Sequence, residues 1–102
     1  MKRVTLHQGA EADLREALEY YESERTGLGG EFRREFEAVL ARVRTGPLGF
    51  AIEGEAEVRF ATLRRFPYRL AFIDLDDRIW IVAVAHHRRR PRYWAGRIPD
   101  GS

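Results

Sequence analysis

The feature that most constrains this chain is one uninterrupted apolar run at residues 79–85, near the C-terminal end. The run is far shorter than the roughly 20 residues that a membrane-spanning helix needs. It is rich in Ile and Val and follows the turn-forming pair Asp76-Asp77, which is typical of a β-strand. A strand that is apolar at nearly every position belongs in the middle of a sheet, where other elements cover it. We therefore expect residues 79–86 to form a central strand that is covered by helices.

Two segments upstream of this run have the spacing of amphipathic helices, because apolar residues recur in each at intervals of three and four. The first stripe contains Ala10, Leu14, Ala17, Leu18 and Tyr21, and the second contains Phe32, Phe36, Val39, Leu40 and Val43. The glycine-rich run at residues 27–30 is expected to end the first helix, and Gly46-Pro47 the second. Two helices joined by a short turn predict an antiparallel helical hairpin.

The polar side of the first helix is strongly acidic. Its carboxylates are Glu11, Asp13, Glu16, Glu19, Glu22 and Glu24. Carboxylates at such density are expected to form a solvated face. Tyr20 stands beside the core-facing Tyr21, and we expect its ring to lie on the outside as a mild indication of a protein partner.

Three further segments, at residues 4–6, 58–63 and 68–74, predict strands. Together with residues 79–86 they give the order β-α-α-β-β-β. This order predicts an α+β domain in which the helical hairpin packs on a small, mainly antiparallel sheet. Residues 1–97 are expected to form a single domain, and residues 98–102 a short C-terminal tail. The segment after His87 is open to three interpretations: a final strand, a short helix, or a segment ordered only by a partner.

The composition of the chain limits the kinds of site and partner that it can have. The 102 residues include no cysteine, which excludes disulfides and thiolate metal sites and fits a reducing compartment. The chain begins without an apolar signal segment, so we expect a cytoplasmic protein with no membrane contact. Residues 1–57 carry eight Lys or Arg against twelve Asp or Glu, whereas residues 58–97 carry ten Arg against three Asp. The basic half predicts a polyanionic or acidic partner, and its arginines suit phosphate or carboxylate recognition.

The most distinctive part of the basic half is the segment of residues 86–97, which contains five Arg, two His, one Tyr and one Trp. Arginines contact phosphates and aromatic rings stack on bases, so this composition favours single-stranded nucleic acid. The same composition suits an acidic groove on a protein. A third interpretation is a solvated tail with Trp94 tucked against the core.

The same segment carries the candidate catalytic groups. His86 and His87 are adjacent strand residues that point to opposite faces, so they do not share a metal, and we expect no metal site and no cofactor. His86 is a candidate general base, and its alternative is a strand-end histidine bonded to backbone. Tyr93, with Arg and His nearby, is a candidate acid for phosphodiester cleavage, in which Arg stabilises the developing charge.

Taken in order, these pieces resemble the RelE/ParE toxin superfamily of bacterial type II toxin–antitoxin systems, nearer the ParE, plasmid-stabilisation branch. The residues that carry the resemblance are 10–17, Tyr20-Tyr21, 27–29, Phe32, Pro47, Val58-Arg59, 63–65, Phe66-Pro67-Tyr68, 82–91 and Tyr93-Trp94. The resemblance implies an antiparallel sheet with a two-helix hairpin. It also implies a cognate antitoxin whose C-terminal segment is disordered alone and wraps the toxin.

The resemblance leaves the target open between two branches. ParE-like members poison DNA gyrase without an established nuclease site, whereas RelE-like members cleave mRNA in the ribosome, using basic residues and often a C-terminal tyrosine. Lys2 is the only lysine here, so the lysine cluster common in the RelE-like branch is missing, and the gyrase interpretation is preferred. If the chain is a ribonuclease, the catalytic candidates are Arg65, His86, Arg89 and Tyr93. A third hypothesis is a non-toxic domain that only binds its antitoxin.

The same resemblance implies a surface for the target or the antitoxin. Its candidate residues are Arg59, Arg65, Arg88, Arg89, Arg90, Arg92, Tyr93, Trp94 and Arg97. On this mapping, deletion of residues 88–102 is expected to abolish toxicity and to leave the fold intact.

Overall fold

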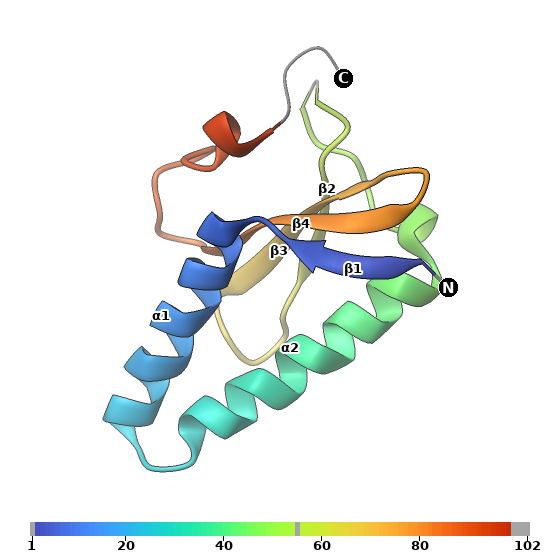
Figure 1. Cartoon of the computed structure of the whole chain (residues 1–102). Coiled ribbons are helices and arrows are strands. Elements are labelled where there is room, and N and C mark those ends of the chain that lie inside the picture. Colours follow the sequence, from blue (N-terminus) through green and yellow to red (C-terminus); the bar gives the residue numbers. More distant parts are fainter. Residues whose placement is uncertain (1, 55, 99–102) are drawn as a thin grey trace.

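The computed structural model describes residues 2–54 and 56–98, and it places the elements in the expected β-α-α-β-β-β order (Figure 1). The helices and strands are β1 (Arg3–Leu6), α1 (Gln8–Glu24), α2 (Leu28–Thr45), β2 (Arg59–Thr62), β3 (Tyr68–Asp74) and β4 (Arg78–His86). Two single-turn 3₁₀ helices, Pro47–Gly49 and Ala95–Arg97, complete the set. The α+β fold class is confirmed, and residues 99–102 of the expected tail lie outside the described residues.

The four strands form one sheet in the order β1-β4-β3-β2, so β4 is a central strand as predicted. β3 pairs with both β2 and β4 in antiparallel fashion, because short turns join these consecutive strands. β1 pairs with β4 in parallel, with Val4 opposite Ile79 and Leu6 opposite Ile81. The sheet is therefore mixed, with one parallel pair at the β1 edge.

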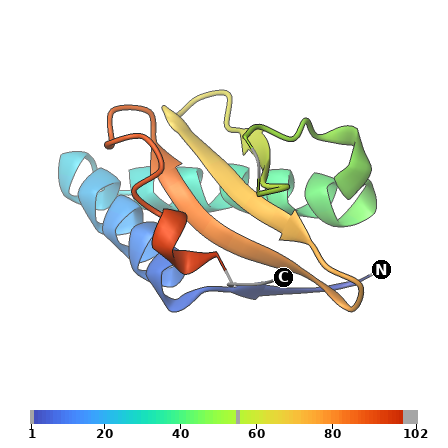
Figure 2. The same ribbon diagram turned by 90° about the horizontal axis from the view of Figure 1, so that it is seen from above.

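Both faces of the sheet are covered, and by different parts of the chain. In Figure 1 the two helices lie below the sheet and the C-terminal segment lies above it. The helix side holds the larger core, which includes Phe32, Phe36, Leu70, Ile79 and Ile81. The opposite side holds a second core of Val58, Ala71, Val82, Ala83, Ala85 and Trp94. Figure 2 shows the C-terminal segment crossing this second face. The apolar run in β4 is thus buried by the helices on one side and by residues 93–98 on the other.

The glycine-rich run does not all belong to the turn between the helices, which corrects the sequence expectation. Gly27 adopts a left-handed conformation with φ of 92° and marks the boundary, but Gly29 and Gly30 lie inside α2. A Cβ on Gly29 would stand 2.9 Å from the Leu18 carbonyl oxygen, so glycine allows the two helices to approach closely here. The Glu22 carboxylate accepts hydrogen bonds from the Gly27 and Gly29 N–H groups, which compensates the start of α2.

Candidate functional site

The C-terminal segment after β4 is neither a strand nor a long helix. It consists of turns and the short 3₁₀ helix Ala95–Arg97, and it lies on the sheet face away from α1 and α2 (Figure 2). Trp94 is only 5% exposed and its ring centre lies 5.8 Å from that of Phe60. The structure therefore places Trp94 in the core, as in the interpretation that tucks it against the core, and very little of its side chain is open to a partner.

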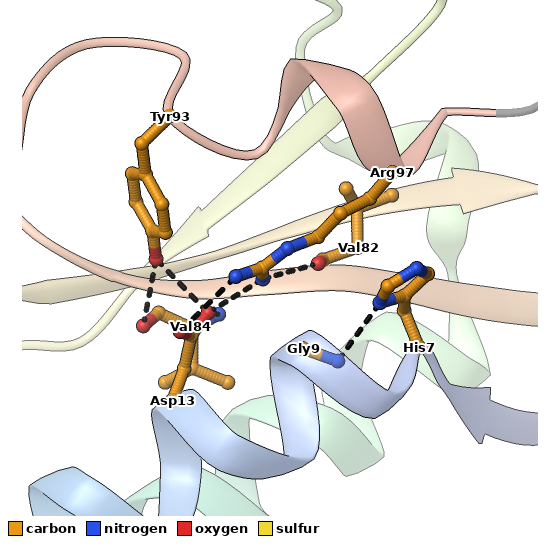
Figure 3. Close-up of polar contacts among 7 residues, drawn as sticks. All are labelled: His7, Gly9, Asp13, Val82, Val84, Tyr93 and Arg97. Atoms are coloured by element: carbon orange, nitrogen blue, oxygen red, sulfur yellow. Dashed lines mark hydrogen bonds and ion pairs between the residues drawn. The ribbon is translucent and has the colours of Figure 1, made fainter.

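A buried carboxylate holds this segment in place (Figure 3). Asp13 Oδ2 accepts hydrogen bonds from Val84 N at 3.1 Å, from the Tyr93 hydroxyl at 2.9 Å and from Arg97 Nη1 at 2.8 Å. Arg97 Nη1 also donates to the Val82 carbonyl oxygen at 3.0 Å. One carboxylate thus ties α1 and β4 to two residues of the C-terminal segment, and we call Asp13, Tyr93 and Arg97 the Asp13 clamp.

The clamp contradicts the expectation that Asp13 belongs to a solvated face. Asp13 is 7% exposed, and Ala10, Asp13 and Ala17 are the buried residues of α1. The signal was present in the spacing, because Asp13 follows Ala10 by three residues and precedes Ala17 by four, which places it in the apolar stripe. The missing information was its cation, which lies 84 residues away in the chain.

Close approach of Arg97 depends on a glycine at the start of α1. A Cβ on Gly9 would stand 2.5 Å from the Arg97 guanidinium carbon, so a larger residue at this position would collide with the guanidinium. The Gly9 N–H is itself bonded to His7 Nδ1 at 2.8 Å, which caps the helix. Arg97, one of the candidate binding residues, therefore belongs to an internal ion pair, and its side chain is only 18% exposed.

An open groove runs along α1 beside the end of β4, with a volume of about 580 Å³. Its lining consists of Asp13, Glu16, Ala17, Tyr20, Tyr21, Glu24, Leu28, Pro67, Tyr68, Val84, His86 and Arg89. We call it the aromatic groove because three tyrosine rings form its walls. Burial raises the pKa of Tyr68 to about 12, with smaller contributions from Tyr21, Glu16 and Tyr20. Tyr20 is 55% exposed, which confirms the expected aromatic ring on the outside of the hairpin.

A second hollow, of about 360 Å³, lies between the ends of β2, β3 and β4 and the C-terminal segment. Its lining consists of Thr62, Arg69, Ala85, His86, His87, Arg89, Arg90, Pro91, Arg92, Tyr93 and Trp94. We call it the basic hollow, since its lining, among the described residues, contains four arginines and two histidines and no carboxylate. His86 and Arg89 line both openings and form the wall between them.

The structure brings three of the four candidate catalytic residues together at the basic hollow, namely His86, Arg89 and Tyr93. The fourth, Arg65, instead forms an ion pair with Glu31 of α2 at 2.7 Å. His86 Nδ1 accepts a hydrogen bond from Arg88 N at 2.9 Å. Burial and the nearby charges of His87 and Arg88 lower the pKa of His86.

The Tyr93 hydroxyl is engaged by the Asp13 clamp. Burial, followed by the Asp13 carboxylate, raises the pKa of Tyr93 well above its usual value of 10.0. The Arg89 guanidinium lies 4.0 Å from the centre of the Tyr93 ring, within the range of a cation–π contact.

The remaining candidate binding residues divide by exposure. Arg88, Arg90 and Arg92 are exposed, whereas Arg59 is half-buried and donates to the Phe50 carbonyl oxygen at 2.6 Å. Over residues 2–54 and 56–98, no group of three or more His, Cys, Asp or Glu side chains is placed to hold a metal ion. None of the helices in this part of the chain is both long and apolar enough to cross a membrane.

Comparison with known proteins identifies the family. The sequence model of one protein family, described as the ParE toxin of the type II toxin–antitoxin system parDE, matches residues 4–91. A comparison with curated proteins gives no match. Among solved structures, the chromosomal ParDE toxin–antitoxin system from P. aeruginosa shares the fold, with a TM-score of 0.74 and 18% sequence identity over 84% of this chain and 96% of that chain. Since the ParE model spans most of the sequence, the chain belongs to the ParE toxin family of type II toxin–antitoxin systems, in which a toxin is paired with an antitoxin.

Proposed function

We propose that this toxin acts by inhibiting DNA gyrase, without catalysing a reaction itself, and that a cognate antitoxin neutralises it. The observation that carries the proposal is the ParE family match over residues 4–91, because the ParE-like branch is the one associated with gyrase. A gyrase target would also place the protein in the cytoplasm. The competing hypothesis is RelE-like cleavage of mRNA. The third hypothesis is that the chain is a non-toxic domain that only binds its antitoxin.

The geometry of the candidate catalytic residues supports binding over cleavage. Phosphodiester cleavage requires a free base and a free acid that face the reacting atoms. Here the Tyr93 hydroxyl donates to Asp13, and His86 Nδ1 accepts the Arg88 N–H. Arg65 is held by Glu31 rather than turned to the basic hollow. Three of the four groups that the ribonuclease hypothesis needs, Arg65, His86 and Tyr93, therefore already have partners within the fold.

Two different surfaces support two different partners. The aromatic groove offers apolar rings for the side chains of an antitoxin segment, and Arg89 at its wall suits an acidic residue of that segment. A segment that folds as it binds would bury those side chains against Tyr20 and Tyr21. The exposed arginines at residues 88–92 are then the proposed contact with gyrase, and Arg89 belongs to both surfaces. An antitoxin in the aromatic groove would thus cover part of the surface that gyrase needs.

The test separates the targets in cells and then in purified components. The chain is expressed in bacteria without antitoxin, and incorporation of labelled thymidine and of labelled methionine is followed over the first minutes. We expect thymidine incorporation to fall first while translation continues. An early fall in methionine incorporation, with newly cut transcripts, would favour the ribonuclease, and unimpaired growth would favour the antitoxin-binding domain.

The second step is a supercoiling assay with purified gyrase and the purified chain. We expect inhibition by the unmodified chain and loss of inhibition in an Arg88→Ala/Arg90→Ala variant, whose residues are exposed. Arg33→Ala/Arg34→Ala removes the same charge from the exposed side of α2 and is the matched control. Equal inhibition by all three proteins would contradict the proposed contact surface, and no inhibition by any of them would contradict the gyrase target.

A further inference from the structure

We infer that the basic hollow is a preformed binding site for the phosphodiester backbone of nucleic acid. The inference concerns binding by this chain alone and does not depend on gyrase as the target. It rests on the charges around the hollow, on the way the fold holds them, and on the contrast between this hollow and the aromatic groove.

The first observation is uncompensated positive charge. Arg69, Arg89, Arg90 and Arg92 line the hollow, together with two histidines, and no carboxylate belongs to its described lining. Arg69 is partly neutralised by Glu53, at 3.2 Å. Within residues 2–54 and 56–98, Arg89, Arg90 and Arg92 form no ion pair, although arginines elsewhere in the chain, such as Arg65 and Arg97, do. Three free guanidinium groups in four residues repel one another, and an anion between them relieves that repulsion.

The second observation is that the fold holds residues 87–93, which we call the arginine turn, in position. The backbone of the turn is bonded at three points, from His87 N to the Pro67 carbonyl, from Arg89 N to the His86 carbonyl and from Tyr93 N to the Arg90 carbonyl.

Two residues of the turn that line the hollow are also held in fixed conformations. Arg92 has a φ of 58°, a left-handed conformation that costs a non-glycine residue energy and persists only where the surroundings impose it. The Arg89 guanidinium lies over the Tyr93 ring, and the Asp13 clamp fixes that ring. A site built this way loses little conformational entropy when a ligand binds.

The third observation separates a nucleic acid from an acidic peptide. A peptide segment gains much of its affinity by burying apolar side chains, and the rings that could receive them line the aromatic groove, on the other side of His86 and Arg89. Trp94 borders the basic hollow, but its ring is already buried in the core and is not open to the apolar side chains of a peptide. What the hollow offers is guanidinium groups, which bind phosphate oxygens in bidentate fashion. A nucleic acid backbone supplies those phosphates at regular spacing, without demanding an apolar pocket.

The experiment uses the purified chain and three fluorescent 20-mers of one sequence: single-stranded DNA, single-stranded RNA and duplex DNA. Binding is measured by anisotropy between 50 and 200 mM salt. About three phosphate contacts predict a slope of log K against log salt near −2 for single strands and near −3 for duplex DNA. In the Arg90→Ala/Arg92→Ala variant we expect the slope to become shallower by about one for each arginine removed, with at least about tenfold weaker binding at low salt.

Two controls make the outcome decisive. Arg33→Ala/Arg34→Ala on α2 removes the same net charge outside the hollow and is expected to keep the slope and most of the affinity. Thermal melts of each variant verify folding, since all four residues are exposed. Preference among the three probes identifies the source of the backbone, and a stronger signal with RNA would indicate that the 2′-hydroxyl contributes.

Three results would overturn the inference. The first is equal weakening of binding in the hollow variant and in the α2 control, which would mean that only net charge matters. The second is binding that does not change with salt. The third is binding of a glutamate-rich peptide, used as a competitor probe, while none of the three nucleic acids binds.

Discussion

The Asp13 clamp makes a quantitative prediction about stability. In the Asp13→Asn variant the Arg97 guanidinium keeps its buried position but loses its counter-charge. The side chains of Asp13 and Arg97 are 5% and 18% exposed, so solvent screens the pair only weakly. Removing one partner of a buried ion pair costs about 3–5 kcal/mol, and the asparagine oxygen still accepts from Val84 N or the Tyr93 hydroxyl. We therefore expect a loss of about 3 kcal/mol in unfolding free energy.

That loss is large relative to the stability of one domain. Domains of this size are stable by roughly 5–15 kcal/mol, and their unfolding entropy is about 2.1 cal/mol/K per residue. For the 102 residues of this chain, 3 kcal/mol corresponds to a drop in melting temperature of about 14 °C. Calorimetry and urea unfolding of the wild type and the variant measure both quantities.

A double-mutant cycle tests the reasoning behind the number. Arg97→Met alone leaves the Asp13 carboxylate buried without its cation and is expected to destabilise the chain as well. In the Arg97→Met background, Asp13→Asn removes that isolated charge and should cost little or even stabilise. If Asp13→Asn costs the same in both backgrounds, to within about 0.5 kcal/mol, the two residues are not coupled and the clamp is not an ion pair in energetic terms.

The clamp also changes how a truncation must be interpreted. The sequence predicts that deletion of residues 88–102 abolishes toxicity and leaves the fold intact. The structure contradicts the second half, because the deletion removes Trp94 from the second core and Arg97 from Asp13. Loss of toxicity after this deletion would not distinguish a lost contact from a lost fold, so point substitutions of exposed arginines are the informative variants.

Three further predictions concern stability and pH. Phe36→Ala removes a ring that is 4% exposed in the helix-side core and should cost about 3–5 kcal/mol by calorimetry, whereas a cost below about 1 kcal/mol would mean that the core collapses to fill the space. Arg89→Ala loses only its contact with the Tyr93 ring, so we expect less than about 1 kcal/mol in the same assay, and a larger loss would make Arg89 a structural residue. Burial and the charges of His87 and Arg88 lower the pKa of His86 below 6.5. Below that pH, His86 therefore binds a proton more readily in the unfolded chain than in the folded chain. The unfolding free energy should therefore decrease as the pH falls below about 6.5, and His86→Gln should flatten that slope; an unchanged slope would show that His86 does not contribute.

Much of the fold could be predicted because its signals are local. Periods of three to four residues predicted α1 and α2, and residues 68–74 were predicted as a strand with the bounds that β3 has. The uninterrupted apolar run predicted a central β4, because only a strand covered on both faces tolerates so many apolar side chains. The boundary at the glycine-rich run was wrong, since Gly29 is needed for helix packing and not for a turn.

The candidate site could be predicted only in outline. The arginine-rich segment was recognisable from composition, and the family from the order of its motifs. Composition does not reveal which arginines are free, because the answer depends on which carboxylates the fold brings to them. Arg65 meets Glu31 and Arg97 meets Asp13, whereas the arginines at positions 89, 90 and 92 meet no carboxylate among the described residues.

The sequence by itself determined the order of the elements, the central strand and the family of this toxin. Each of these depends on the pattern of neighbouring residues or on the order of motifs along the chain. The tertiary structure alone decided that Asp13 is buried, that Trp94 covers the second face of the sheet and that the basic hollow exists. The physical reason is distance along the chain. A carboxylate can enter an apolar stripe only if a cation reaches it there, and that cation, Arg97, lies 84 residues away and arrives only when the C-terminal segment folds back over β4.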